Sequence, residues 1–318
     1  MTGRPARRSG AARPTLARAA AALALSLLAL APPAPTAAED HQVIAAVVGD
    51  YGSPGANSAA VAALITSWTP DVVVTTGDNS YTGDLDADIG ALYHGFIHPY
   101  GGRYGAGAAV NRFYPCLGNH DWDQGVDCDG ESCHGAHLDY FALPGNERYY
   151  DFAAGPVRFF MVDSDVREPH GTTAGSAQAE WLKTALAAST ARWNIVCFHH
   201  SPYSSGSASP GLRWPFPDWG ATAVISAHLH VYERVMKSGF PYFVNGLGGR
   251  SKHPFGAIEP GSAIRFNAAF GAMRIVATAE DITFQFHAID ASEPIDTFVI
   301  KARTVAPTTW GAIKAAYR

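Results

Sequence analysis

Five short apolar runs in this sequence each end in residues that can bind a cation, and this pattern restricts the fold more than any other feature. The runs extend over Gln42 to Val48, Asp71 to Thr75, Phe113 to Leu117, Trp193 to Phe198 and Ala223 to Ser226. They are rich in β-branched residues and are bounded by turn formers, which predicts buried strands. Asn57 to Trp68 and Ser176 to Ala188 lie between them and are predicted to be helices.

The segments at the ends of these runs carry carboxylates, an amide, a phenol and imidazoles. They read Gly49-Asp50-Tyr51-Gly52, Gly77-Asp78-Asn79-Ser80-Tyr81, Gly118-Asn119-His120-Asp121, His199-His200-Ser201-Pro202 and Ala227-His228-Leu229-His230. In α/β sheets, sites assemble at the carboxyl ends of the strands. A single Gly-Asp pair or histidine has many structural explanations, but five such endings in succession indicate a metal site.

The rest of the chain predicts further strands. Tyr149 to Asp163 has the pattern of a hairpin that turns at Ala154-Gly155-Pro156. Strand-like runs then follow at Tyr242 to Val244, Met273 to Ala277, Ile282 to Ile289 and Thr297 to Lys301. We therefore expect an α/β fold in which two mixed β-sheets face each other and helices cover them, built as a single domain over residues 39–318.

Residues 1–38 have the pattern of a secretory signal peptide. Five arginines precede the first acidic residue, an apolar run extends from Ala19 to Ala31, and small residues end the segment at Ala38. The apolar run is too short to span a bilayer, and no later stretch is long enough. We expect cleavage near Ala38 and a secreted or periplasmic protein without a membrane span; the pair Arg7-Arg8 leaves the twin-arginine export route open beside the general one.

The net charge restricts the classes of binding partner, and the cysteines indicate the redox state of the compartment. The formal net charge is -5, which argues against nucleic acid binding and against broad attraction to anionic membranes. Cys128 and Cys133 lie in a polar loop, where an oxidising compartment favours a disulfide, with a metal clip as the alternative. Cys116 and Cys197 lie in apolar runs and are predicted to be buried thiols.

The ligand chemistry predicts two ions rather than one. The candidate ligands are Asp50, Asp78, Tyr81, Asn119, one of His199 and His200, His228 and His230. This set has no thiolate and suits Fe, Mn or Zn. Seven protein ligands are too many for one ion, whereas two ions that share a bridging carboxylate would use them all. Such centres serve phosphate ester hydrolysis, whose uncatalysed barrier is very large.

The order of the five motifs resembles the purple acid phosphatases within the calcineurin-like metallophosphoesterase superfamily. The matching segments are Asp50-Tyr-Gly52, Gly77-Asp-Asn-Ser-Tyr81, Gly118-Asn-His-Asp121, Val196-Cys-Phe-His199 and Ala227-His-Leu-His230, followed by Val231 to Arg234 and Asn245-Gly-Leu-Gly-Gly249. The resemblance implies a metallophosphoesterase-type sandwich. It also implies that Asp50, Asp78, Tyr81 and His230 hold a first ion, and that Asp78, Asn119, His199 and His228 hold a second. Tyr81 implies Fe(III) at the first site, and the second takes Fe, Zn or Mn.

Three histidines need a separate interpretation. The resemblance makes His120 a contact for the substrate phosphate, beside Asn119, and a proton donor, with a structural role as the alternative. Spacing from Val196 selects His199 as a ligand, whereas alignment on Ser201-Pro202 selects His200; we prefer His199 and place His200 near the substrate.

One histidine of the family pattern is missing. Relatives often carry a further histidine about nine positions after the fourth-motif ligand, and Ser204 to Pro210 has none. Either His120 alone handles the proton, or a residue of another loop, such as His253, takes part.

Together these observations predict an exported binuclear metal-dependent phosphatase. It would hydrolyse small-molecule phosphate monoesters by in-line attack of a metal-bound hydroxide, with Asp78 and His120 in catalytic positions. The alternatives are a phosphodiesterase or nucleotide-cleaving enzyme, a catalytically silent exported protein that binds metal or phosphate, and a redox role for an iron pair.

Overall fold

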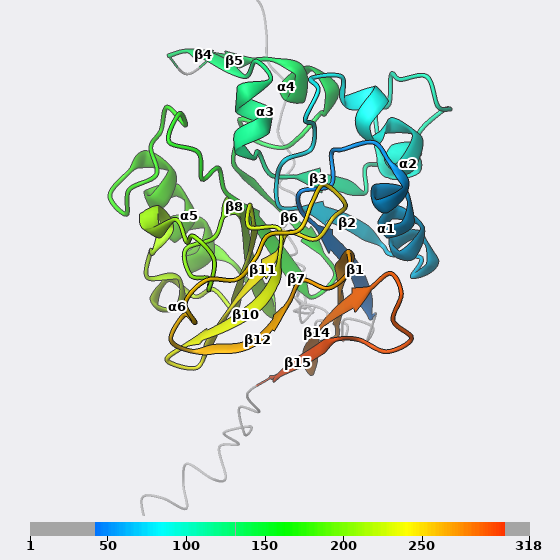
Figure 1. The fold of residues 1–318 in the computed structure, drawn as a ribbon. Helices are drawn as coiled ribbons and strands as arrows, with labels where there is room; N and C mark the ends of the chain where they lie inside the picture. Colours follow the sequence, from blue (N-terminus) through cyan, green and yellow to red (C-terminus); the bar gives the residue numbers. More distant parts are fainter. Residues whose placement is uncertain (1–41, 131, 303–318) are drawn as a thin grey trace, which may run out of the picture. The chain divides into compact units, whose positions relative to one another are not determined.

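Two mixed β-sheets stacked face to face form the centre of the computed structural model, which describes residues 42–130 and 132–302 (Figure 1). The first sheet has the strand order β15-β14-β13-β1-β2-β3. Its strands are β1 (Val43–Val48), β2 (Val72–Thr75), β3 (Phe113–Pro115), β13 (Gly271–Ala277), β14 (Asp281–Ala288) and β15 (Asp296–Lys301). β1, β2 and β3 are parallel, and all four residues of β2 are buried, as expected for a parallel strand covered on both faces.

The second sheet has the order β12-β10-β11-β9-β8-β7-β6. Its strands are β6 (Tyr150–Ala154), β7 (Val157–Met161), β8 (Trp193–His200), β9 (Ala223–Ala227), β10 (Tyr232–Lys237), β11 (Phe240–Asn245) and β12 (Ser262–Phe266). The strands β7, β8, β9 and β11 are mutually parallel, while β6, β10 and β12 pair antiparallel with their neighbours. A separate two-stranded sheet joins β4 (Asp127–Asp129) to β5 (Ser132–His134).

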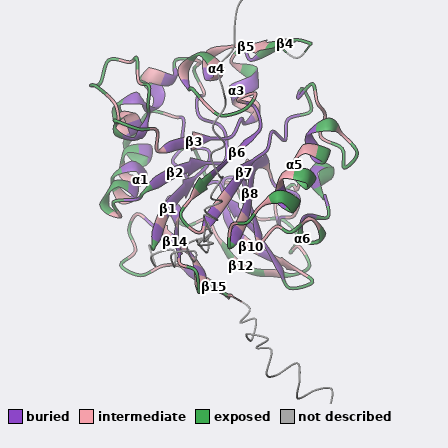
Figure 2. Ribbon diagram, turned by 180° about the vertical axis from the view of Figure 1, so that it is seen from behind, coloured by how far each residue is buried: buried purple, intermediate pink, exposed green. Residues whose placement is uncertain are grey.

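The main hydrophobic core lies between the two large sheets. Val47 and Val74 of the first sheet, Ile225 and Phe243 of the second, and Phe284 of β14 are completely buried there. Figure 2 shows that the buried residues follow the strands, whereas the outer helices are exposed on one side. This fixed core positions the strand ends that carry the candidate ligands.

Helices cover the outer face of each sheet. α1 (Ala56–Ser67) packs Val61 and Ile65 against the first sheet, and α5 (Ala177–Ala188) packs Leu182 and Leu186 against the second. α5 begins where the Ser176 side chain accepts a hydrogen bond from the Ala179 N–H. The remaining helical segments are short: η1 (Asp86–Gly90), α2 (Ala91–Tyr93), η2 (His94–Phe96), α3 (Asn119–Asp123), α4 (Ala136–Tyr140), η3 (Pro210–Leu212) and α6 (Phe216–Trp219).

The predicted fold class is confirmed, with some differences in the elements. The five ligand-bearing runs and both long helices form as expected, but β3 ends at Pro115, before the predicted boundary at Leu117. β8 extends through His200, so His199 lies within the strand rather than after it. Two strands that the sequence did not reveal, β10 and β12, complete the second sheet.

The cysteine predictions are confirmed. Cys128 and Cys133 form a disulfide that links β4 to β5, and Cys116 and Cys197 are buried free thiols. The predicted signal peptide, residues 1–38, lies outside the described residues. Within residues 42–130 and 132–302, none of the helices has the length and apolar character needed to cross a bilayer.

Candidate metal centre

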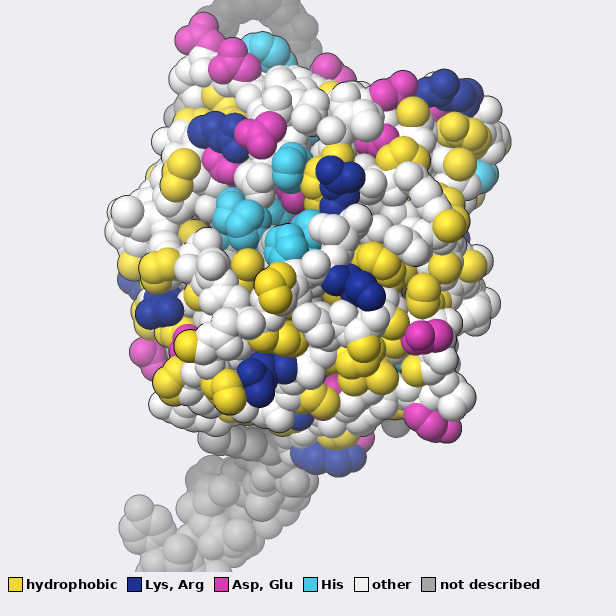
Figure 3. Space-filling view, in the orientation of Figure 1, with side chains coloured by type: hydrophobic (Ala, Val, Ile, Leu, Met, Phe, Trp, Pro, Cys, Tyr) yellow, Lys and Arg dark blue, Asp and Glu magenta, His cyan; other side chains and the backbone are white. Residues whose placement is uncertain are grey.

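The predicted ligands gather at one edge of the two sheets. Asp50 follows β1, Asp78 follows β2, His199 is the next-to-last residue of β8, and His228 directly follows β9. Ligand atoms of Asp50, Asp78 and His199 all lie within 4.8 Å of one another. Figure 3 shows histidine side chains grouped together on the face that carries this edge. The sequence motifs therefore converge in space.

One donor set consists of an amide oxygen, two imidazole nitrogens and a carboxylate oxygen. Asn119 Oδ1 lies 3.1 Å from His199 Nε2 and 3.0 Å from His228 Nδ1, and these two nitrogens are 3.2 Å apart. Asp78 Oδ1 is 3.3 Å from His199 Nε2. Ligands about 2.1 Å from a single ion lie roughly 3 Å from one another, so these four atoms have the spacing of one coordination shell.

A second donor set lies on the other side of Asp78. The Tyr81 hydroxyl donates a hydrogen bond of 3.0 Å to Asp78 Oδ2, and His230 Nε2 lies 3.2 Å from Asp50 Oδ1. The two carboxylate oxygens of Asp78 thus face different donor sets. This is the arrangement that a bridging carboxylate requires.

Three of the predicted ligands have a strained backbone, which is common at functional sites. Asp50, Asp78 and His228 have φ values of 55°, 56° and 67°, in the left-handed region that residues other than glycine rarely occupy. Close packing of the loops enforces the geometry: a Cβ atom at Gly118 would lie 2.3 Å from Asp78 Oδ1. The glycine that begins the third motif is therefore required because the Asp78 carboxylate occupies the space beside it.

The buried carboxylates of Asp50 and Asp78 lie close together, and a cation between them would offset their repulsion. Burial, and then repulsion from Asp78, raises the pKa of Asp50 well above its ordinary value. Among the described residues, the buried Asp50 Oδ1 atom accepts no well-aligned hydrogen bond, although His230 Nε2 lies 3.2 Å away. A cation beside Asp50 would supply both the missing partner and the missing positive charge, so the residues present fit a metal centre.

The imidazoles of His199, His228 and His230 are uncharged at neutral pH and can therefore act as metal ligands. Burial lowers the pKa of His228 and of His230 to about 4, and burial together with His228 lowers that of His199 well below its ordinary value. Neutral imidazoles keep a lone pair for a metal. The other nitrogen of His199, Nδ1, lies 2.8 Å from the Thr76 carbonyl oxygen, which orients Nε2 toward the cluster.

His199 and His200 occupy different environments. Along β8 and β9 the pairing shifts register between Cys197 and His200, which places one extra residue in β8. His199 is fully buried within the cluster, whereas His200 Nδ1 lies 2.9 Å from the Ser164 hydroxyl. The His200 ring still stands beside that of His228, with 4.5 Å between centroids, so it borders the centre.

His120 lies on the solvent-exposed side of the cluster, which we call its mouth. Its ring centroid is 4.5 Å from that of Tyr81, and its backbone N–H donates to Asp78 Oδ1 at 3.0 Å. The side chain remains 40% exposed, with Nδ1 3.8 Å from Asp123 Oδ2. His120 is thus close to both donor sets and open to a ligand from solvent.

Sequence reasoning missed three residues around the centre. Asp121 accepts hydrogen bonds from the backbone N–H groups of Gly118 and Asn79, and so ties the second and third motif loops together. The Ser251 hydroxyl lies 2.5 Å from His230 Nδ1. Arg250 places its guanidinium 4.6 Å from the Tyr81 ring centroid. Asp121 belongs to the third motif and Arg250 directly follows the segment Asn245-Gly-Leu-Gly-Gly249, so the sequence pointed to both positions without assigning either a role, whereas nothing in it indicated Ser251.

Arg250 gives the mouth of the centre positive charge. Its side chain is exposed, and within the described part of the chain no carboxylate lies at ion-pair distance from it. Its backbone N–H donates to the Asp50 carbonyl oxygen at 3.2 Å, which fixes the segment beside the first motif. In Figure 3 basic side chains border the histidine group. An anionic ligand that approaches this mouth is attracted to it.

Comparisons with known proteins agree with this geometry. The family model of the calcineurin-like phosphoesterases matches residues 41–232. The purple acid phosphatase PPD1 from yellow lupin (Lupinus luteus) seeds superposes with a TM-score of 0.65 at 18% identity. That alignment covers 84% of this chain and 55% of the lupin protein, so the chain spans about half of that protein's length.

A second solved structure shares the fold. GAP50, the anchor in the inner membrane complex of Plasmodium, superposes with a TM-score of 0.60 at 19% identity, over 82% of this chain and 89% of GAP50. At such identities the likeness concerns the fold alone. No curated protein matches the sequence significantly.

Proposed function

We propose, from the premise that the chain belongs to the calcineurin-like phosphoesterase family, that it is an exported phosphatase that hydrolyses phosphate monoesters. Family membership makes the chain a metal-dependent phosphoesterase with a binuclear centre, and the buried cluster of Asp50, Asp78 and His199 agrees with that. The preference for monoesters, iron at the Tyr81 site and the export are our proposals.

The position of Asp78 carries the proposal. Its Oδ1 atom lies 3.3 Å from His199 Nε2, and its Oδ2 atom accepts the Tyr81 hydrogen bond. Asp50, Asp78, Tyr81 and His230 would hold one ion, and Asp78, Asn119, His199 and His228 the other. When bound, the two ions supply charge neutralisation for the phosphoryl group and acidify the attacking water.

Tyr81 supports iron at the first site. Without a cation, burial and the nearby Asp50 and Asp78 raise the pKa of Tyr81, so the phenol keeps its proton and donates a hydrogen bond to Asp78. Only a strongly charged ion favours the phenolate in such surroundings. Fe(III) meets this requirement better than a divalent ion, and Fe, Zn or Mn would suit the second site.

Residues at the mouth would bind and orient the phosphate ester. The exposed Arg250 side chain attracts the dianion. The family resemblance assigns phosphate contact and proton donation to His120, and its partly exposed ring beside Tyr81 supports this role. Asn119 and His200 flank the same opening.

The donor set, rather than the fold, favours catalysis over a purely binding role. The fold also occurs in GAP50, whose description is that of an anchor, so the fold alone does not distinguish the two roles. The proposal is supported by the short distances between the side chains predicted as ligands, which link Tyr81 to Asp78, Asn119 to His228, and Asp50 to His230. Export is supported by the Cys128–Cys133 disulfide, because such bonds persist in oxidising compartments.

The test measures hydrolysis and metal content together. Asp78→Ala and His228→Ala should abolish hydrolysis of p-nitrophenyl phosphate and reduce bound metal, while His134→Ala, a change of an exposed histidine in β5, should retain both. Comparison with bis(p-nitrophenyl) phosphate distinguishes monoester from diester hydrolysis. Full activity in the Asp78 and His228 variants would end the proposal.

A further inference from the structure

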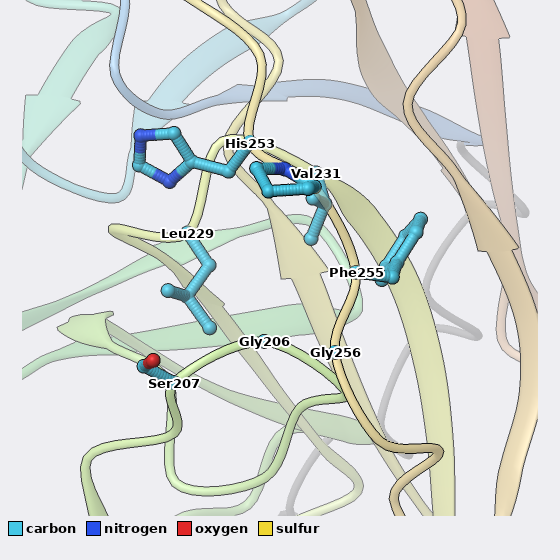
Figure 4. A pocket seen from close by; sticks show the side chains of 8 residues that line it. Gly206, Ser207, Leu229, Val231, His253, Phe255 and Gly256 are labelled. Carbon is cyan, nitrogen blue, oxygen red and sulfur yellow. The ribbon is translucent and has the colours of Figure 1, made fainter.

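A pocket of about 340 Å³ opens beside the candidate metal centre (Figure 4). Three separate segments line it: Gly206 and Ser207, then Leu229 and Val231, then His253 to Gly256. Its size is at the lower end of the range for pockets that hold small molecules. None of the residues assigned above to the metal ions lies among its lining residues, so it is a distinct part of the site.

The pocket shares a wall with the first donor set. The His253 ring stacks on the His230 ring, with 4.1 Å between centroids and 11° between planes. His253 Nδ1 also accepts a hydrogen bond of 3.3 Å from the His230 backbone N–H. Leu229 stands between His228 and His230 in the sequence, and Figure 4 shows its side chain directed into the pocket below His253. A molecule held at the metal centre therefore adjoins this space.

The lining is apolar and carries no formal charge. Leu229 and Val231 are buried, and Phe255 packs against the cluster that they form with Val244. Of the eight lining residues, only Ser207 and His253 have polar side chains. Such a surface binds an apolar group by removing it from water, and it offers a charged or polyhydroxylated group only these two polar side chains.

The walls are held in place before any ligand binds. The buried Glu233 carboxylate accepts hydrogen bonds from the Ser204 hydroxyl and the Ser205 N–H, at 2.8 and 2.7 Å. The Gly256 N–H donates to the Ser205 carbonyl oxygen at 2.6 Å, which joins two of the lining segments. A ligand that binds in a preformed pocket loses little binding free energy, because the walls need not be ordered first.

We propose that this pocket binds the organic part of the substrate, so that the enzyme prefers phosphate esters of aromatic or other apolar alcohols. This inference rests on the proposed function. In the reaction, the bond between phosphorus and the ester oxygen breaks, water supplies the oxygen that phosphorus gains, and the alcohol leaves with a proton. The pocket would hold the ring of that alcohol while the phosphoryl group stays at the metal ions.

The test compares two esters in the metal-loaded full chain. Phe255→Ala should lower kcat/KM for 1-naphthyl phosphate about ten-fold, the effect of losing roughly 55 Å² of apolar contact, and should change kcat/KM for glycerol 2-phosphate less than two-fold. Phe255→Leu, which keeps apolar volume, should show a smaller loss. Phe298→Ala is the matched control, because Phe298 is also half-buried beneath an arginine but lies on β15. Equal falls for both esters would overturn the inference.

A binding measurement separates this inference from the proposed function. If the wild-type protein hydrolyses neither ester, the proposed function fails, and calorimetry with 1-naphthylmethylphosphonate and methylphosphonate then tests the pocket alone. A preference for the naphthyl compound that Phe255→Ala removes supports the pocket as a ring-binding site. The absence of such a preference in the wild-type protein overturns it.

Discussion

Glu233 is a buried carboxylate whose replacement should loosen the loop beside the metal centre. It lies on β10, is fully buried, and accepts four hydrogen bonds. Oε2 accepts from the Ser204 hydroxyl at 2.8 Å and the Ser205 N–H at 2.7 Å, and Oε1 from the Ser205 and Ser262 hydroxyls at 2.5 and 2.6 Å. These bonds fix residues 204–206, which lead into the pocket described above.

The expected cost follows from what each substitution leaves unsatisfied. In Glu233→Gln the amide oxygen can keep the Ser204 and Ser205 N–H bonds, and the two other hydroxyls can rotate to accept from the amide NH₂. Only the charge assistance is lost, which amounts to about 1–2 kcal/mol. In Glu233→Ala the buried Ser205 N–H has no acceptor and a cavity remains, so about 3–5 kcal/mol is expected.

Denaturant and thermal unfolding measure this difference. For a domain of this size, about 2 kcal/mol corresponds to a fall in Tm of roughly 4–8 °C. Glu180→Gln is the matched control, because Glu180 is an exposed residue of α5 whose pairing with Lys183 should contribute little. A Glu233→Gln variant as stable as the control, or a Glu233→Ala variant no less stable than Glu233→Gln, would refute this account of the carboxylate.

Three further predictions address the metal, the pH dependence and the disulfide. Tyr81→Phe should remove the visible phenolate-to-iron absorption of iron-loaded protein, and an unchanged spectrum would exclude Tyr81 as a ligand. Burial lowers the pKa of His137 to about 3, so as pH falls below about 6.5 the unfolded chain takes up a proton that the folded chain does not, and stability is lost. His137→Leu should therefore gain stability relative to wild type by up to about 1.4 kcal/mol per pH unit between pH 6.5 and 4; parallel stability curves would contradict this. Cys128→Ser should destabilise the β4–β5 hairpin by about 2 kcal/mol, seen as faster proteolysis there, without changing metal content.

The sequence was informative wherever local chemistry alone decides the structure. β2 consists of Val72–Thr75, a β-branched run that forms a strand in almost any packed context, and Asp78 must follow it at the sheet edge. Gly118, the first residue of the third motif, leaves room for the Asp78 carboxylate, which occupies the space that a side chain would need. The strand β2 and the position of Asp78 at its end could therefore be predicted, since each depends on a few neighbouring residues.

The choice between His199 and His200 as the metal ligand could not be decided from the local sequence. A regular strand alternates its faces, so the ligand follows from counting residues along β8. The extra residue between Cys197 and His200 breaks that count, and it exists only in relation to the pairing with β9. Spacing from Val196 and alignment on Ser201 gave different answers because neither measure includes the partner strand.

The strands β10 and β12 were missed for a related reason. β12 alternates partly buried with exposed residues at the edge of its sheet, and its segment, Ser262–Phe266, has only one strongly β-branched residue. Pairing with β10 makes it a strand, and that pairing interrupts its register between Arg234 and Val235. Edge strands of this kind depend on a neighbour that the sequence does not identify.

The apolar pocket is the part of the site most dependent on tertiary structure. Its lining comes from residues 206–207, 229–231 and 253–256, and the last of these segments belongs to no helix or strand, so no periodicity indicates the direction of Phe255. Glu233 connects the segments physically: it holds Ser205, and Ser205 in turn accepts from Gly256. Because Glu233 accepts hydrogen bonds from Ser204 and Ser205, next to the pocket, and from none of the predicted metal ligands, disturbing it should alter the pocket before the metal centre. Glu233→Ala should therefore selectively lose aryl ester hydrolysis while it retains its metal content.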